Sequence, residues 1–171
     1  MTTLVQAFRI SEHKDVRLPI MICQDGFITS HAVENIELLE DADVKNFVGE
    51  YEPEDYLLNP ECPMAVGPYS ITDYYMEAKR NQAEGTRNVS RVVKEVAEDF
   101  EKLSGRKYGL FEEYRMEDAE RAVVIIGSAA GTTKDAVDRL REQGEKVGLI
   151  KIRLFRPFPA DEIAEALKMS R

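Results

Sequence analysis

The sequence has few residues of the kinds that bind metals and no segment that could cross a membrane. Its 171 residues include two cysteines and two histidines, with no CxxC pair and no Cys/His cluster at ligand spacing. We therefore expect no metal site in this chain. No apolar run approaches the roughly 18–20 residues of a bilayer span, and the N-terminus lacks a secretion-signal pattern. We expect a cytoplasmic chain that has no membrane partner.

A surplus of positive charge is also missing. The formal net charge is −9, with acids and bases mixed along the chain. The resulting field repels phosphate backbones and anionic lipid, so nucleic acid is not an expected partner. No Ser–His–Asp or Cys–His arrangement can be proposed, and we predict no catalytic residue. Cys23 lies in an apolar run and is expected to be a small buried residue.

The N-terminal part alternates helical and extended patterns. Residues 2–13 predict a helix that leads into a strand at 20–23, and residues 31–40 and 41–49 predict two further helices. The last of these would begin at Asp41 or Asp43 and end at Gly49. The apolar face of the first helix would consist of Leu4, Ala7 and Phe8.

A proline-rich segment precedes the clearest helical pattern. Residues 51–68 contain four of the seven prolines and follow no period, which indicates an ordered surface crossing. A long helix then begins near Thr72 or Asp73 and ends at Ser104 and Gly105. Gly85 weakens this helix by about 1 kcal/mol relative to alanine and indicates a kink or a split. Its apolar stripe is Val89, Val92, Val93, Val96, Ala97, Phe100 and Leu103.

The C-terminal part reads as βαβα. Residues 106–120 are charged and aromatic without a clear period, as is typical of a linker, and we place a domain boundary between 115 and 116. The strands are expected at 122–126 and 147–155, and the helices at 133–143 and from Asp161. The first of these helices would turn Ala136, Val137 and Leu140 inward. Two strands joined through a helix are parallel, with a right-handed crossover.

The strand "RAVVIIG" is too uniformly apolar for a sheet edge that faces water. More strands are needed beside it, and the single strand at 20–23 implies the same for the first domain. We expect the chain to be a slice of a larger polypeptide or part of an obligate assembly.

The turn "GSAAGTTKD" after that strand fits neither GxGxxG nor a P-loop. A phosphate cradle at a helix N-terminus is the functional alternative. We favour a plain turn at Gly127, with a threonine capping the helix and Asp135 in its first turn.

Several segments, in one order, resemble the alpha subunit of pyruvate:ferredoxin oxidoreductase and related 2-oxoacid:ferredoxin oxidoreductases. They are "LVQAFRISEHKDVRLPIMICQDGFITSHAVENIELL", "VKNFVGEY", "DYYMEAKRNQAE", "EKLSGRKYGLFEEYR" and "AVVIIGSAAGTTKDAVDRLREQGEKVGLIKIRLFRPFPADEIAEAL". The resemblance implies α/β architecture with three-layer α/β/α parallel sheets. Residues 1–115 would end a pyrimidine-binding domain for thiamine diphosphate with its helical linker. Residues 116–171 would begin a transketolase C-terminal-like domain.

The family resemblance also implies a function. Such enzymes decarboxylate a 2-oxoacid oxidatively, pass electrons to ferredoxin and form acyl-coenzyme A. Thiamine diphosphate with magnesium and iron–sulfur clusters would belong to the assembled enzyme, with none bound by this chain alone. The partners would be beta, gamma and ferredoxin-like delta subunits, and ferredoxin. We expect this chain to contribute scaffold and subunit interface and to be inactive in isolation. The alternative is a non-catalytic βαβ nucleotide-binding or interaction module.

The candidate contact residues follow the predicted strand ends, where ligands sit in open α/β sheets. The first group could line a substrate channel, with His31 donating to a carboxylate or to coenzyme A; it consists of Asp25, Gly26, Phe27, Ser30 and His31. The structural alternative has Asp25 and Gly26 forming a turn, Phe27 filling a core or interface, and Ser30 capping a helix from His31. In "RLFRPFP", Arg156 could bind an anion while Phe155 and Phe158 face a partner surface, or Arg153 and Arg156 could pair with carboxylates. We favour packing of this stretch, within the chain or against a partner subunit.

Overall fold

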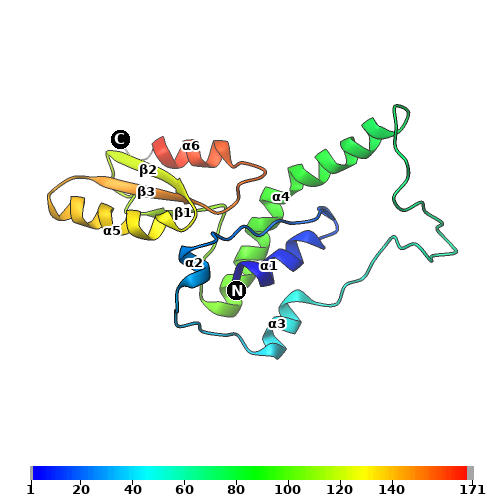
Figure 1. Cartoon of the computed structure of the whole chain (residues 1–171), viewed down its shortest axis with the longest axis horizontal. Coiled ribbons are helices and arrows are strands. Elements are labelled where there is room, and N and C mark those ends of the chain that lie inside the picture. The colour runs from blue at the N-terminus through cyan, green and yellow to red at the C-terminus, as the bar shows by residue number, and fades with distance from the viewer. Residues whose placement is uncertain (1, 169–171) are drawn as a thin grey trace.

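The computed structural model describes residues 2–168, which form a helical body beside a small sheet (Figure 1). No helix in this range is long and apolar enough to cross a bilayer. The elements in chain order are α1 (Thr2–Ser11), α2 (Ile28–His31), α3 (Asp41–Val48), α4 (Tyr75–Ser104), β1 (Phe111–Tyr114), β2 (Arg121–Ile126), α5 (Ala129–Glu142), β3 (Val147–Ile152) and α6 (Ala160–Lys168).

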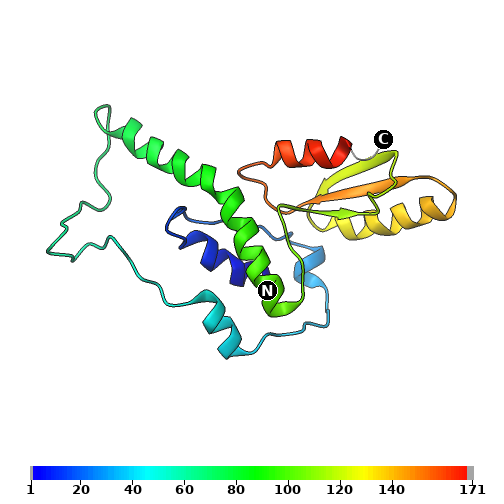
Figure 2. The same cartoon turned by 180° about the vertical axis from the view of Figure 1, so that it is seen from behind.

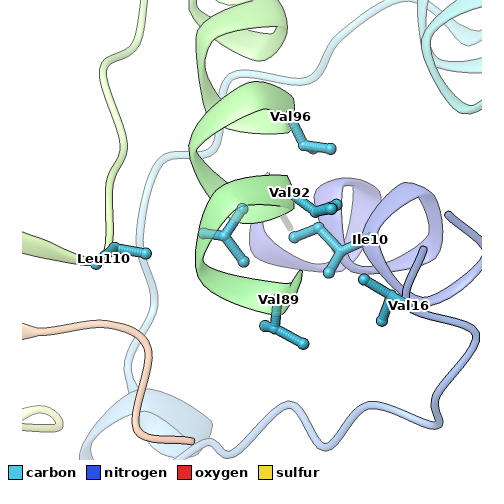
Figure 3. Packing of buried hydrophobic residues seen from close by; sticks show 7 residues of the cluster. Ile10, Val16, Val89, Val92, Val96 and Leu110 are labelled. Atoms are coloured by element: carbon cyan, nitrogen blue, oxygen red, sulfur yellow. The ribbon is translucent and has the colours of Figure 1, made fainter. Parts of the chain in front are cut away.

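The helical body is built where α1 packs on the C-terminal half of α4. Ile10 and Val16 meet the valine stripe of α4, as Figure 3 shows, and Val92 is fully buried there. The predicted stripe is thus confirmed except at Leu103, which is only partly buried. The predicted face of α1 is only partly right. Ala7 is buried, whereas Leu4 and Phe8 are about half exposed. The inner face of α1 is instead Gln6, Ala7 and Ile10, one helical turn of neighbouring positions.

Helix α4 is continuous from Tyr75 to Ser104, so the prediction of a split at Gly85 is wrong. Gly85 serves packing: a Cβ there would lie 2.7 Å from the carbonyl oxygen of Val16. The chain entering from α1 can cross α4 this closely only over a residue without a side chain. The helix ends as predicted, because Gly105 adopts a left-handed φ of 68°.

The sheet has the order β1-β3-β2. β2 and β3 are parallel, as predicted, while β1 pairs antiparallel with β3. β1 lies within the expected linker, so that part of the prediction is wrong; the boundary between 115 and 116 stays a prediction. Val137 of α5 packs with Leu149 on one face, and Ile163 of α6 with Ile150 on the other. Helices on both faces make three layers, which confirms the α/β class.

The strand β2 forms the open edge of this sheet. Val123, Val124 and Ile126 are 41%, 42% and 51% exposed. An apolar parallel-type strand is normally covered on both faces and paired on both sides. The need for further strands beside β2 therefore stays a prediction, now attached to a defined edge.

The segment between α1 and α4 departs most from expectation (Figure 2). Residues 20–23 are not a strand, and residues 32–40 are not helical. Cys23 is exposed rather than buried. The physical reason is that a strand needs a neighbouring backbone to pair with, and no described residue supplies one here.

Helix α3 forms where residues 41–49 predicted it, and Gly49 ends it with a φ of 77°. The residue at its start is Glu40, and no side chain caps the helix. Asp41 and Asp43 lie instead in the first turn, where their charge favours the helix N-terminus.

Candidate functional site

The DGF turn, residues 25–31, is organised by one carboxylate. Asp25 accepts hydrogen bonds from the backbone N–H of Thr29 at 2.7 and 3.1 Å and from that of Phe27 at 3.4 Å. Hydrogen bonds from the hydroxyl and N–H of Thr29 lower the pKa of Asp25. The Asp25 carboxylate thereby satisfies backbone N–H groups at the start of α2. A helix of four residues is not stable in water without such support.

The aromatic side chains of the turn are paired but uncovered. Phe27 stacks on His31 with ring centroids 5.3 Å apart, and the Ser30 hydroxyl lies 2.7 Å from Nδ1 of His31. Phe27 remains 73% exposed, so it does not fill a core of the described residues. Ser30 does not cap a helix starting at His31, because α2 ends there. The turn, with Gly26 at its bend, is therefore preformed and its polar and aromatic groups are accessible.

Arg156 is not bonded to the DGF turn within the described residues. No hydrogen bond or ion pair joins Arg156 to the turn, or to any carboxylate, within residues 2–168. Beside it, Phe155 and Phe158 are 66% and 50% exposed and form an edge-to-face pair at 6.4 Å. This surface combines an available cation with an aromatic pair.

Arg153, by contrast, is used internally, and not by a carboxylate as one alternative supposed. It donates to Oε1 of Gln6 at 2.9 Å and to the Gly109 carbonyl at 3.3 Å, and lies over the Tyr108 ring at 4.7 Å. Burial lowers the pKa of Arg153. Gln6 is fully buried, and among the described residues its Nε2 has no hydrogen-bond partner. This pair joins α1 to the end of β3, and sequence reasoning missed Gln6 although it lies on the buried stripe of α1.

The glycine turn after β2 is a strand-to-helix turn at Gly127, with a φ of 86°. Helix α5 begins at Ala129, four residues earlier than predicted, so no threonine caps it. Thr133 instead donates to the Ala129 carbonyl at 2.8 Å. Asp135 lies beyond the first turn, and of the three residues predicted to face inward only Val137 is buried.

Two cavities of the described residues do not fit thiamine diphosphate. They measure about 420 and 450 Å³. The first is lined by four carboxylates against Lys14 and Arg17, and this surplus of negative charge disfavours a diphosphate; the carboxylates are Glu12, Glu52, Glu54 and Asp55. The second is a shallow surface of Arg115, Asp138, Arg141 and Glu142 with no apolar wall for an aromatic ring. No group of three metal-ligating side chains occurs within residues 2–168 either.

Comparison with known families settles the class of protein. Residues 1–98 match the model of the pyruvate flavodoxin/ferredoxin oxidoreductase family, thiamine diphosphate-binding, and residues 119–171 match core domain II of pyruvate:ferredoxin oxidoreductase. The chain belongs to the pyruvate flavodoxin/ferredoxin oxidoreductase family.

Its relatives include alpha-type subunits from bacteria and archaea. The chain is 51% identical over 163 residues to pyruvate synthase subunit PorA of Thermotoga maritima, covering 95% of this chain and 42% of that subunit. It is 40% identical to PorA of Methanothermobacter thermautotrophicus over 98% of this chain and 44% of the relative. It is also 41% identical to the alpha subunit of the NADH-dependent phenylglyoxylate dehydrogenase of Aromatoleum evansii, over 98% and 42%. The chain spans less than half the length of these relatives.

Proposed function

We propose that the chain is part of the alpha subunit of a 2-oxoacid:ferredoxin oxidoreductase. The observation that carries this is the order of two matches: a thiamine diphosphate-binding region and core domain II of the same enzyme follow each other along one chain. The assembled enzyme would decarboxylate its 2-oxoacid oxidatively, form acyl-coenzyme A and pass electrons to ferredoxin. This chain would contribute scaffold and interface, and would be inactive alone.

The cofactors would be held elsewhere in the assembly. Thiamine diphosphate with magnesium, and iron–sulfur clusters, would supply the electron sink and the path for electrons. The partners would be the beta, gamma and ferredoxin-like delta subunits, with ferredoxin as acceptor. Two exposed, unpaired cysteines suit a reducing compartment, and we place the enzyme in the cytoplasm.

The proposed contact residues are the DGF turn and Arg156. The turn holds Phe27 and His31 as a preformed, exposed pair, so it could border a substrate channel at little ordering cost. Arg156, free of carboxylate partners within residues 2–168, could receive an anionic group. The boundary between residues 115 and 116 remains part of this proposal.

Pyruvate is the proposed substrate, because the pyruvate synthase subunits reach the highest identity among the relatives named above. The phenylglyoxylate relative is nearly as similar as the archaeal ones. Both 2-oxoacids therefore belong in the test.

The test is a chimera in which this chain replaces the matching segment of Thermotoga maritima PorA, assembled with the other subunits of that enzyme. We expect a complex on a sizing column and pyruvate-dependent reduction of ferredoxin. A complex that reduces ferredoxin only with phenylglyoxylate would overturn pyruvate, and failure to assemble would overturn the proposal.

The DGF turn is tested in the same chimera. His31→Gln is expected to raise KM or lower kcat by about tenfold, as loss of one positioned hydrogen bond does. The matched control is His13→Gln, just after α1, where Nδ1 accepts a hydrogen bond from the Asp15 N–H at 3.2 Å and lies 3.9 Å from the Asp15 carboxylate. Equal effects of the two variants would leave the turn without a special role.

A further inference from the structure

The segment between α3 and α4, residues 49–74, is called here the acidic strap. It lies outside the body of the molecule and contains no helix or strand (Figures 1 and 2). It has no lysine, arginine or histidine. Its acids are Glu50, Glu52, Glu54, Asp55, Glu61 and Asp73. The strap is therefore strongly negative within a chain that is already negative.

The same segment exposes large apolar side chains. Leu58 and Tyr69 are 84% and 89% exposed, and no residue of the strap is buried. A run of uncovered tyrosine and leucine marks a surface that another molecule covers, because tyrosines in particular are frequent binding anchors. The large exposed residues are Tyr51, Tyr56, Leu57, Leu58, Met64, Val66, Tyr69, Ile71 and Tyr74.

Among the described residues, ion pairs hold only the beginning of the strap. Arg17 pairs with Glu54 at 2.5 Å and with Asp55 at 3.4 Å. Within residues 2–168, Glu50, Glu52 and Glu61 have no ion pair. These carboxylates remain available to a partner and sit among the apolar anchors.

The charge selects the occupant. A second copy of this chain, at −9, would repel the strap, and so would nucleic acid or anionic lipid. We propose that the acidic strap docks on a protein surface of a different subunit that is rich in lysine and arginine and carries apolar pockets. This rests on the proposed function, since that subunit is sought within the same enzyme complex. The carboxylates would steer the encounter and the tyrosines and leucines would be buried.

The exposed thiol of Cys62 lies in the strap, so its rate of alkylation reports whether the strap is covered. In the PorA chimera with Cys23→Ser, alkylation of Cys62 by N-ethylmaleimide is followed by peptide mass spectrometry. Addition of the remaining pyruvate synthase subunits is expected to slow labelling at least about tenfold, as burial in a closed interface does. The control is Arg139→Cys on the exposed side of α5, with Cys23 and Cys62 changed to serine, whose labelling rate should not change.

The role of charge is tested by the triple variant Glu50→Gln/Glu52→Gln/Glu61→Gln. Its Kd for the partner subunits should rise about tenfold at low salt and approach that of the parent at high salt. The matched control, Glu98→Gln/Glu101→Gln/Glu142→Gln, removes the same charge from exposed helix positions and should stay within about twofold.

Each other result overturns the proposal in a distinct way. A complex in which Cys62 reacts at the free rate refutes strap docking and leaves the proposed function standing, whereas no complex refutes both. Protection of Cys62 in the chimera before subunits are added means that the strap packs on its own subunit. Concentration-dependent protection with self-association means that a second copy is the occupant.

Discussion

Residues 17–84 and residues 85–168 differ in burial. Between 17 and 84 no residue is buried, although the segment contains many isoleucines, leucines, tyrosines and phenylalanines. From Gly85 onward the valines of α4, Leu149 and Ile150 form closed clusters. The difference teaches that apolar composition alone does not make a core. A core forms where the chain returns to cover its own apolar face.

The comparison is sharpened most by one phenylalanine from each region. Phe100 is fully buried between Phe47 and Tyr108, at ring distances of 5.3 and 5.8 Å. Phe100→Ala should lower the free energy of unfolding by about 3–5 kcal/mol, because it leaves a cavity. Phe27→Ala, at an exposed site, should change it by less than about 0.5 kcal/mol. Urea unfolding followed by circular dichroism measures both, and equal losses would contradict the contrast.

Arg153 tests the join between the helical body and the sheet. Arg153→Ala removes the hydrogen bond to Gln6 and leaves that buried amide without a partner on either end. We expect a loss of about 2–3 kcal/mol in the free energy of unfolding. Arg153→Lys keeps the charge but not the forked geometry and should recover part of the loss. Arg156→Ala, on the exposed loop, is the control and should have little effect on stability.

Two helical glycines separate packing from helix propensity. Gly85→Ala places a Cβ 2.7 Å from the Val16 carbonyl, whereas Gly131→Ala in α5 meets nothing within 4 Å. We expect the first to lower the free energy of unfolding by about 1–2 kcal/mol and the second to raise it by about 0.5 kcal/mol. Thermal unfolding of the pair is the measurement. Stabilisation by Gly85→Ala would show that residues 16–18 do not press on α4.

The smallest expected effect concerns the ion pair between α1 and α4. A hydrogen bond from Lys102 and the charge of Arg9, 2.7 Å away, lower the pKa of Asp99. A lowered folded-state pKa gives stability that is present above the ordinary value of about 3.9 and lost as pH falls through the folded value. Because Asp99 is 39% exposed, the contribution is below about 1 kcal/mol.

Asp99→Asn should therefore reduce the free energy of unfolding at pH 7 and leave it unchanged at pH 2. The variant should lose less stability on acidification than the unsubstituted chain. Urea unfolding at the two pH values measures this. Glu98→Gln, its exposed neighbour, is the control. If the pH dependence of stability is unchanged in Asp99→Asn, the ion pair does not contribute to stability.

Sequence alone determined the elements whose signal is local. The valine stripe of α4, its end at Gly105, the parallel β2–α5–β3 unit and the preformed turn around Asp25 depend on periodicity and on residues a few positions apart. Several family-specific segments in one order also identified the family. The contact roles proposed for the residues of the DGF turn stay a prediction.

Only the tertiary structure decided the features that depend on distant neighbours. It made β1 an antiparallel strand, left residues 20–23 unpaired, and set Gln6 against Arg153 from positions 147 residues apart. It also showed that Gly85, expected to weaken α4, is the position where the chain near Val16 packs closely against that helix. The physical reason is that a strand, a buried amide or a close approach is stabilised by a partner surface, and a sequence pattern specifies the need for that partner without specifying where it lies.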